Sequence, residues 1–321
     1  MVTAGQNVPK IGDLRELRGF TEAPAGLPGA DPNALDFPPV RNGIDYLLSV
    51  VDHLTADPVG PRHVKYAVLH LQAAAEVLLK ARLVREHWSL VFDDPGAASE
   101  KAFRSGDFKS CTVGEAVTRL RNIAGVTITD KDQEALATLG RDRNALQHYG
   151  LSHNARAVEA RAGRVLDFLM RFLDDVLVPG LQLDEVERIT ADVRRIRRGL
   201  TGVHAFITQR LRRLSGDLKG CETRTITCLY CGQMTLVVKR PLSTCLFCDA
   251  EVGVSEMTTH FFLNTPEGEA SRTAFCPNCA EYAVARNTLL ATGERADFCF
   301  WCVCPVSLHL PAPSPESSGQ S

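Results

Sequence analysis

Eight of the eleven cysteines form four pairs, and two residues separate the members of each pair. They are Cys228, Cys231, Cys245, Cys248, Cys276, Cys279, Cys299 and Cys302. This spacing lets both thiolates of a tight turn reach one tetrahedral metal ion at about 2.3 Å. In a reducing compartment, such pairs indicate metal binding rather than disulfides. The pattern predicts two zinc ions, each structural because four thiolates leave no coordination position open.

The four pairs can combine into two sites in two ways. Sequential pairing, the simpler solution, joins the first pair with the second and the third with the fourth. Cross-braced pairing joins the first with the third and the second with the fourth, and Cys304 could replace a ligand. Gly232 suits the turn after a second sulfur, and the alternating segment 234–240 predicts a hairpin strand. Residues 221–310 therefore resemble a β-rich double zinc ribbon.

The zinc-binding region is acidic. From Cys221 to Leu310, six Arg and Lys stand against nine Asp and Glu, a net charge of −3. Two zinc ions with their eight thiolates lower this charge to about −7. Because such a surface repels phosphate, nucleic acid is not its expected ligand. The aromatic residues Phe247, Phe300 and Trp301 are expected to be exposed and to contact a protein partner or inhibitor.

A second set of reactive side chains, Arg143, Asn144 and His148, lies in one predicted helix. Asp130 is expected to cap the start of this helix and Gly150 to end it. Asn144 and His148 are four residues apart, so they share one face. Arg143 falls beside a stripe of leucines, where an unpaired charge is costly. Its partner is therefore expected to be a carboxylate or a phosphate.

The segment RNALQH, residues 143–148, resembles the R-x4–6-H signature of HEPN domains. HEPN domains are all-helical and usually form homodimers in which two such motifs face each other. Many are metal-independent endoribonucleases that leave a 2′,3′-cyclic phosphate. By this resemblance, Arg143 holds the phosphate, His148 exchanges protons, and Asn144 orients His148 or the RNA.

The helices that position this motif are expected to form a bundle over residues 39–180. Segment 61–92 is apolar almost all round, which is typical of a central bundle helix. Within this segment Glu76 has two candidate partners. It either pairs with Lys80 one turn later or supports Arg143 from across the bundle, and the first interpretation is favoured.

Residues 181–220 are expected to form a basic amphipathic helix that links the bundle to the zinc region. Between Arg188 and Lys219, nine Arg and Lys stand against two Asp, a net charge of +7. The densest part contains Arg194, Arg195, Arg197 and Arg198. These arginines either form a solvated face or follow the phosphates of RNA. The apolar residues are spaced like a coiled-coil seam, weakened by Gly199 and Gly202.

The whole chain of 321 residues is long enough for about two domains. Its net charge of −2 does not by itself indicate nucleic acid binding. No secretory signal is recognised and no stretch approaches the ~20 apolar residues of a membrane span, so a cytoplasmic protein is expected. Segments 1–38 and 311–321 are expected to be disordered. The predicted fold class is an all-α, HEPN-like bundle, then a basic helix and a small β-rich zinc-ribbon-like module.

Two functions compete on these patterns. The favoured hypothesis is a metal-independent endoribonuclease, a toxin or anti-phage defence effector whose zinc module senses a signal or docks a partner. The alternative is a non-catalytic helical homodimer that presents the zinc module to another protein. Redox sensing by the C-x-x-C pairs is disfavoured, because metal ligation explains all four pairs together.

Overall fold

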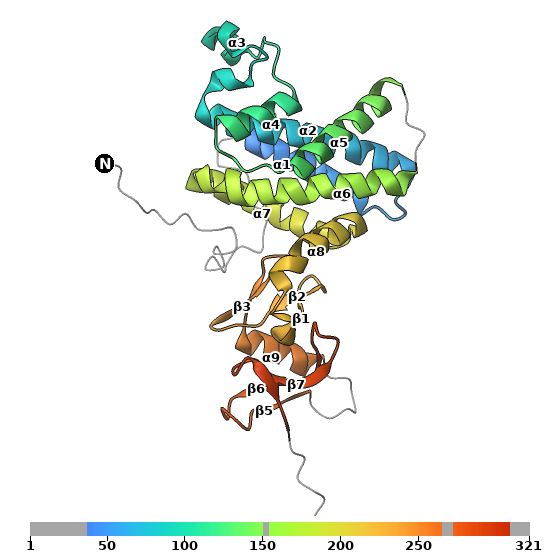
Figure 1. Cartoon of the computed structure of the whole chain (residues 1–321), viewed down its shortest axis with the longest axis vertical. Helices are drawn as coiled ribbons and strands as arrows, with labels where there is room; N and C mark the ends of the chain where they lie inside the picture. Colours follow the sequence, from blue (N-terminus) through green and yellow to red (C-terminus); the bar gives the residue numbers. More distant parts are fainter. Residues whose placement is uncertain (1–36, 150–153, 265–271, 309–321) are drawn as a thin grey trace, which may run out of the picture. The chain divides into compact units, whose positions relative to one another are not determined.

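The computed structural model describes residues 37–149, 154–264 and 272–308. The chain divides into two compact units between Arg212 and Arg213. The first unit is helical and the second contains two small antiparallel sheets (Figure 1), which confirms a helical region followed by a β-rich module. Within the described ranges, every helix is too short or too polar to cross a membrane. The predicted arm 1–38 (up to residue 36) and the predicted tail 311–321 lie outside the described residues.

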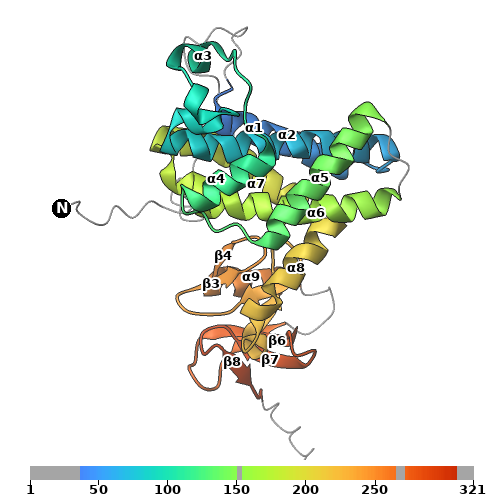
Figure 2. The ribbon, with the colours of Figure 1, turned by 45° about the horizontal axis from the view of Figure 1, so that its top comes forward.

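The first unit is built from packed helices (Figures 1 and 2). Its α-helices are α1 (Pro39–Leu54), α2 (Pro61–Glu86), α3 (Glu100–Ser105), α4 (Val113–Asn122), α5 (Asp130–His148), α6 (Ala155–Phe172), α7 (Leu183–Leu200) and α8 (His204–Leu218). Short 3-10 or π turns join some of them: η2 (Trp88–Val91), η3 (Pro95–Ala97), η4 (Leu173–Leu177) and η5 (Val178–Gly180). The last turns of α8 continue past the division between the units.

The core of this unit is organised around α2, which contacts α1, α4, α5 and α6. Apolar residues recur around α2, and Leu71, Leu78 and Leu79 are fully buried. Full burial of one such side chain contributes about 1.5–3 kcal/mol to folding. The central position predicted for this segment is therefore explained by its nearly uniform apolar surface.

Helix α5 begins at Asp130, one residue earlier than predicted. Thr129, not Asp130, is the N-cap residue, because its hydroxyl accepts a hydrogen bond from the Asp132 amide at 3.2 Å. The Asp132 carboxylate accepts the Thr129 amide in return, also at 3.2 Å, which completes a capping box. The helix ends at His148, and the predicted stop at Gly150 lies outside the described residues.

The predicted linker does not form one continuous helix. It divides at residues 201–203 into α7 and α8, close to Gly199 and Gly202. Helix α7 packs on α1, and a Cβ at Gly199 would lie only 2.2 Å from Val51 Cγ1. The buried apolar face of α7 therefore completes the bundle core, where a coiled-coil seam was predicted.

The second unit contains two four-stranded antiparallel sheets with one helix between them in sequence. The first sheet consists of β1 (Thr225–Thr227), β2 (Met234–Val237), β3 (Leu242–Cys245) and β4 (Glu251–Gly253), after the short turn η6 (Glu222–Arg224). Helix α9 (Val254–Leu263) follows, and the second sheet consists of β5 (Thr273–Phe275), β6 (Tyr282–Leu289), β7 (Arg295–Cys299) and β8 (Cys304–Val306). The sheets meet where the Ala291 amide donates to the Thr225 carbonyl at 2.9 Å.

Candidate functional site

The eight paired cysteines converge on two points in the second unit. One group is Cys228, Cys231, Cys245 and Cys248, and the other is Cys276, Cys279, Cys299 and Cys302. The structure therefore has the sequential pairing, the simpler of the two predicted solutions. In each group, one cysteine pair lies in the turn between the first two strands of a sheet and the other in the turn between its last two strands, which is consistent with zinc-ribbon modules.

The sulfur atoms of both groups are spaced as a tetrahedral metal ion requires. Cys228 and Cys248 Sγ lie 3.7 Å apart, and Cys279 and Cys299 Sγ lie 3.8 Å apart. Four sulfurs at about 2.3 Å from one zinc ion would be separated by about 3.8 Å. The two groups could thus bind metal ions and fit two structural zinc sites.

All four cysteine turns share one backbone conformation. The residue after the second cysteine of each pair has a positive φ: 70° at Gly232, 57° at Asp249, 60° at Ala280 and 58° at Val303. The amide of each of these residues donates to the carbonyl of the first cysteine of its pair, at 2.8–3.0 Å. Only one of the four is glycine, so residue preference alone does not account for this turn.

Backbone amides donate hydrogen bonds to at least one sulfur in each cysteine group. The Tyr230 amide donates to Cys228 Sγ at 3.4 Å, and the Cys302 amide donates to Cys299 Sγ at 3.3 Å. Hydrogen bonds with neighbouring thiols, of which the one with Cys231 has the largest effect, lower the pKa of Cys228. Such hydrogen bonds, above all the one with Cys228, raise the pKa of Cys248. Thiols this close cannot all ionise without a cation between them, so the donor set fits Zn²⁺.

Two of the three aromatic residues predicted to be exposed are buried. Phe247 is 3% exposed and Phe300 is 0% exposed, since both pack inside the second unit. Phe300 lies against the rings of Phe298 and Phe261, at centroid distances of 6.0 and 5.5 Å. Trp301 is 37% exposed and carries the Arg240 guanidinium 3.9 Å from its ring centroid.

Arg143, Asn144 and His148 lie at the exposed C-terminal end of α5. Arg143 is half-buried, whereas Asn144 and His148 are exposed. Arg143 Nη1 donates to Asn144 Oδ1 at 2.8 Å, so the neighbouring amide orients the guanidinium. Within the described ranges, neither Arg143 nor His148 pairs with a carboxylate. The ring of the exposed Tyr149 lies 6.0 Å from that of His148.

The charged residue on the buried face of α5 is Asp142 rather than Arg143. Asp142 is 7% exposed and lies three residues after the buried Leu139. Arg161 of α6 compensates this charge, with Nε 2.6 Å and Nη2 3.1 Å from the two carboxylate oxygens. Asp142 therefore lies on the buried face with the leucines, and Arg143 lies at the edge of that face.

Glu76 forms its ion pair within α2, with Lys80 one turn later. Lys80 also donates to Ser110 Oγ at 2.8 Å. In the part of the chain that the structure describes, no contact joins Glu76 to Arg143. The arrangement is the i, i+4 pair of the favoured interpretation.

The basic run of α7 is divided between paired and solvent-facing arginines. Arg195 contacts both oxygens of Asp52 at 2.9 and 3.1 Å, and Arg197 contacts Asp174 at 2.5 Å. Arg194 and Arg198 are exposed. Half of the positive charge in this run therefore already has an anionic partner within the bundle.

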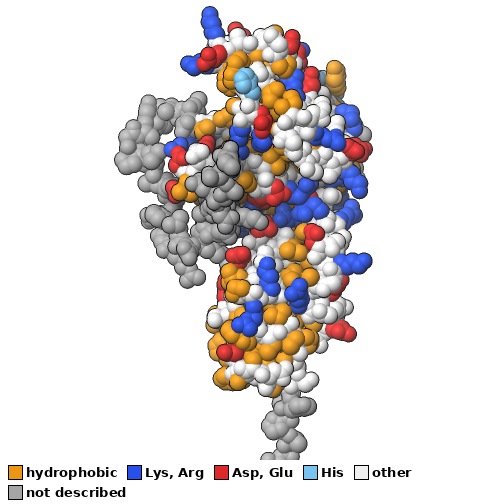
Figure 3. Space-filling model, turned by 60° about the vertical axis from the view of Figure 1, so that its left-hand side comes forward, with side chains coloured by type: hydrophobic (Ala, Val, Ile, Leu, Met, Phe, Trp, Pro, Cys, Tyr) orange, Lys and Arg blue, Asp and Glu red, His pale blue; other side chains and the backbone are white. Residues whose placement is uncertain are grey.

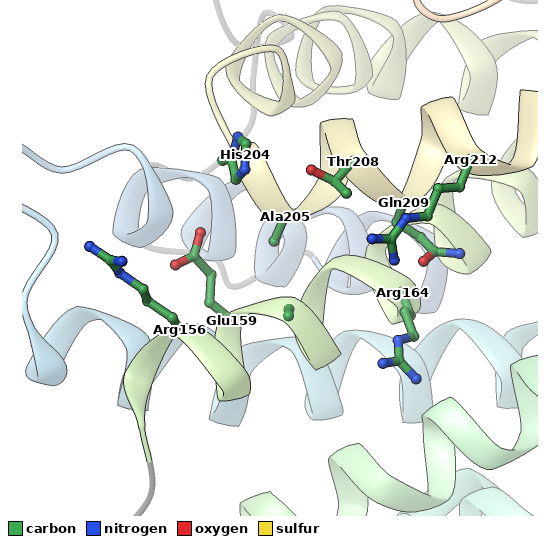
Figure 4. A pocket seen from close by; sticks show the side chains of 9 residues that line it. Arg156, Glu159, Arg164, His204, Ala205, Thr208, Gln209 and Arg212 are labelled. Atoms are coloured by element: carbon green, nitrogen blue, oxygen red, sulfur yellow. The ribbon is translucent and has the colours of Figure 1, made fainter.

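A groove between α6 and α8 brings together arginines that sequence patterns did not single out (Figure 4). Arg156 and Arg164 come from α6, and His204 and Arg212 come from α8. The one sequence signal was the spacing of Arg156 and Arg164, eight residues apart on one helix face. Facing residues of another helix cannot be inferred from that spacing.

No known protein family, curated protein or solved structure matches this chain. The likeness to HEPN domains therefore depends on the RNALQH segment and its helical surroundings.

Proposed function

We propose that the helical unit is a metal-independent endoribonuclease whose site consists of Arg143, Asn144 and His148. The observation that carries this proposal is the common position of these three side chains at the exposed end of α5. Asn144 orients Arg143, and no carboxylate of the described residues neutralises it. An oriented guanidinium beside an exposed imidazole is suited to bind a phosphate and to move a proton next to it.

The proposed reaction is transesterification within the RNA strand. The 2′-oxygen attacks the adjacent phosphorus while its proton passes to a base, and the bond to the 5′-oxygen breaks as that oxygen gains a proton. The products are a 2′,3′-cyclic phosphate and a free 5′-hydroxyl. In this proposal His148 is the group that exchanges protons, and Arg143 stabilises the charge that develops on the phosphate. A homodimer through the helical unit would supply a second His148 for the second proton transfer.

The zinc ions that we assign to the two cysteine groups are structural in this proposal. Four thiolates would occupy every coordination position of each ion, so the metal would stabilise the fold and take no part in the reaction. Such thiolate sites persist in reducing compartments, which favours a cytoplasmic protein. The unit that they hold together is the proposed docking site of a protein partner or inhibitor.

An RNA cleavage assay on the full-length chain tests the enzymatic proposal. We expect His148→Ala to abolish cleavage and Arg143→Ala to reduce it by on the order of 10²-fold or more. Gln147→Ala, an exposed neighbour on the same turn, is the matched control and should cleave normally. Cleavage should persist when EDTA is present only during the assay, and the products should end in a cyclic phosphate. Equal cleavage by the parent and His148→Ala would reject the site.

A second candidate function is supported by the surface of the zinc-binding unit. Apolar side chains reach the surface on the face that Figure 3 shows. Phe275 and Tyr282 are 66% and 42% exposed and stack edge to face, and Leu263 of α9 is 72% exposed. Such residues suit protein contact. If the folded protein cleaves no RNA with or without its partner, the non-catalytic scaffold is the better description.

A further inference from the structure

The groove between α6 and α8 exists because the two helices approach closely at one glycine. A Cβ at Gly163 would lie 2.7 Å from the carbonyl carbon and oxygen of Ala205, so the α6 backbone packs directly on α8. Beside this contact the groove encloses about 540 Å³, within the range of ligand-binding pockets. Helix packing, rather than a mobile loop, therefore sets the width of the groove.

Positive charge is concentrated in this groove. Its lining includes Arg156, Arg164, Arg212 and His204 against one carboxylate, Glu159. Arg164, Arg212 and the neutral Gln209 lie at one end, and Arg156, Glu159 and His204 lie at the other (Figure 4). The Arg164 end has no acidic side chain in its lining, so it is the stronger site for an anion.

The arginines of α6 differ in what they contact. Arg161 pairs with Asp142, and Arg171 pairs with Asp132 at 2.8 Å, so both are held by the bundle. Arg156 and Arg164 are exposed and pair with no carboxylate among the described residues. A guanidinium that lines a groove without such a partner is available to bind phosphate oxygens through two parallel hydrogen bonds.

The groove is long enough for more than one phosphate. Arg156 and Arg164 are eight residues apart on α6, which corresponds to about 12 Å along the helix axis. Helix α8 begins at His204, so the positive end of its dipole adds to the field at the Arg156 end. Thr208 offers a neutral hydrogen-bonding group between the two ends (Figure 4). These features fit an extended polyanion better than a single inorganic ion.

We infer that the groove between α6 and α8 binds the phosphate groups of a single-stranded RNA. The inference rests on the proposed ribonuclease function for the identity of the strand. Arg156 follows the α5 site by eight residues along the chain, and α5 packs on α6. An RNA strand in the groove would therefore lie on α6, the helix that packs on α5. A free nucleotide carries the same phosphate chemistry and is the competing occupant.

The test measures binding of a fluorescein-labelled single-stranded RNA by fluorescence anisotropy over a range of salt concentrations. The full-length chain carries His148→Ala in every sample, so that the strand stays intact. Arg156→Gln with Arg164→Gln should weaken binding about tenfold or more. The slope of log affinity against log salt should fall by about 1.4, the value for two lost phosphate contacts on a single strand.

A double variant on α3 and the segment after it is the matched control. Arg104→Gln with Lys109→Gln removes the same charge from side chains that are 77% and 81% exposed. Helix α3 lies away from α8 in both ribbon views (Figures 1 and 2). Affinity and slope should be unchanged in this control, and all variants should melt at the parent temperature.

Three results would overturn the inference. The first is that the groove variant binds RNA with the same affinity and salt slope as the His148→Ala parent. The second is that this parent binds no RNA. The third is that AMP displaces the RNA, binds with an affinity equal to or higher than that of RNA, and loses affinity in the groove variant. That result would assign the groove to a free nucleotide. Groove-dependent RNA binding without cleavage by the unmodified chain would reject the ribonuclease and leave the groove assignment standing.

Discussion

The two units position their candidate sites by different means. In the second unit, the candidate ligands come from cysteines three residues apart in sequence, and the sulfur atoms of each group lie within 4.8 Å of one another. In the first unit, the role of each arginine depends on whether another helix supplies a carboxylate. Arg161 and Arg164 are neighbours on α6, yet one is paired with Asp142 and the other lines a groove. A metal site is thus encoded locally, whereas a charged helical surface is decided by packing.

Removal of metal should produce the largest difference in stability between the two units. Binding of structural zinc by small peptides is worth about 10–16 kcal/mol, so the second unit should unfold without it. We expect a strong chelator to expose residues 221–305 to hydrogen exchange and to leave α1–α7 protected. Hydrogen exchange followed by mass spectrometry measures both units in one sample. Loss of protection throughout the chain would contradict the independence of the helical unit.

Substitution of the two neighbouring arginines of α6 tests the contrast inside the helical unit. Arg161→Ala leaves the buried Asp142 carboxylate without its partner and should destabilise this unit by about 3 kcal/mol. Arg164→Ala, the control, should change its stability by no more than about 0.5 kcal/mol. Denaturant unfolding followed by the helical signal checks both values. Equal losses would show that the Asp142–Arg161 pair does not stabilise the bundle.

Addition of a methyl group at Gly163 should have the next largest effect on stability. Gly163→Ala forces its Cβ against the backbone of Ala205 and should destabilise the helical unit by about 1–3 kcal/mol. Gly216→Ala is the control within α8, because no atom lies within 4 Å of its added Cβ. That change should stabilise the helix by about 0.5–1 kcal/mol. Melting temperatures that move in the same direction would contradict the close approach of α6 and α8.

Substitutions in the cysteine turns test whether the metal imposes the left-handed backbone. Gly232→Ala should destabilise the second unit by about 1 kcal/mol, because alanine tolerates a φ of 70° less well than glycine. Val303→Asn should stabilise it by a similar amount, about 1 kcal/mol, since asparagine accepts this conformation more readily than a β-branched residue. Competition with a zinc-binding dye reports both effects. A weaker zinc affinity in Val303→Asn would count against imposed strain.

The smallest expected effect is a pH dependence of the helical unit. Burial lowers the pKa of His70, and the nearby His53 lowers it further, while Asp45 opposes the shift. Since the folded pKa lies below 6.5, the stability from neutral His70 is complete above pH 6.5 and declines as the pH falls below that value. In His70→Gln, the melting temperature should therefore depend less on pH between about pH 7 and pH 5. A melting temperature of His70→Gln that falls as steeply with pH as that of the parent would contradict this assignment.

Local spacing was sufficient for several elements before any tertiary contact was known. The cysteine pairs predicted the two four-sulfur groups, because three-residue spacing within a turn already places two sulfurs near one point. The alternating segment after Gly232 predicted β2, and the uniform apolar surface of segment 61–92 predicted the central helix α2. Each of these signals involves residues within one element, where backbone geometry alone relates sequence to space.

Other features depended on neighbours that the local pattern does not contain. Asp142 faces inward because Arg161 compensates it, so Arg143 remains at the edge of the buried face. Phe247 and Phe300 lie between cysteines of their turns but point into the unit, since other elements cover them.

The sequence by itself determined which residues can ligate metal and which segments are helical, because bond lengths and helical periodicity act over a few residues. Only the tertiary structure decided which charges are neutralised. Arg195 forms an ion pair with Asp52, which lies 143 residues earlier in the chain. The groove between α6 and α8 forms beside Gly163, whose missing side chain allows the backbone of Ala205 to approach closely. Electrostatic and packing energies depend on distances between residues in space, and the local sequence pattern does not specify those distances.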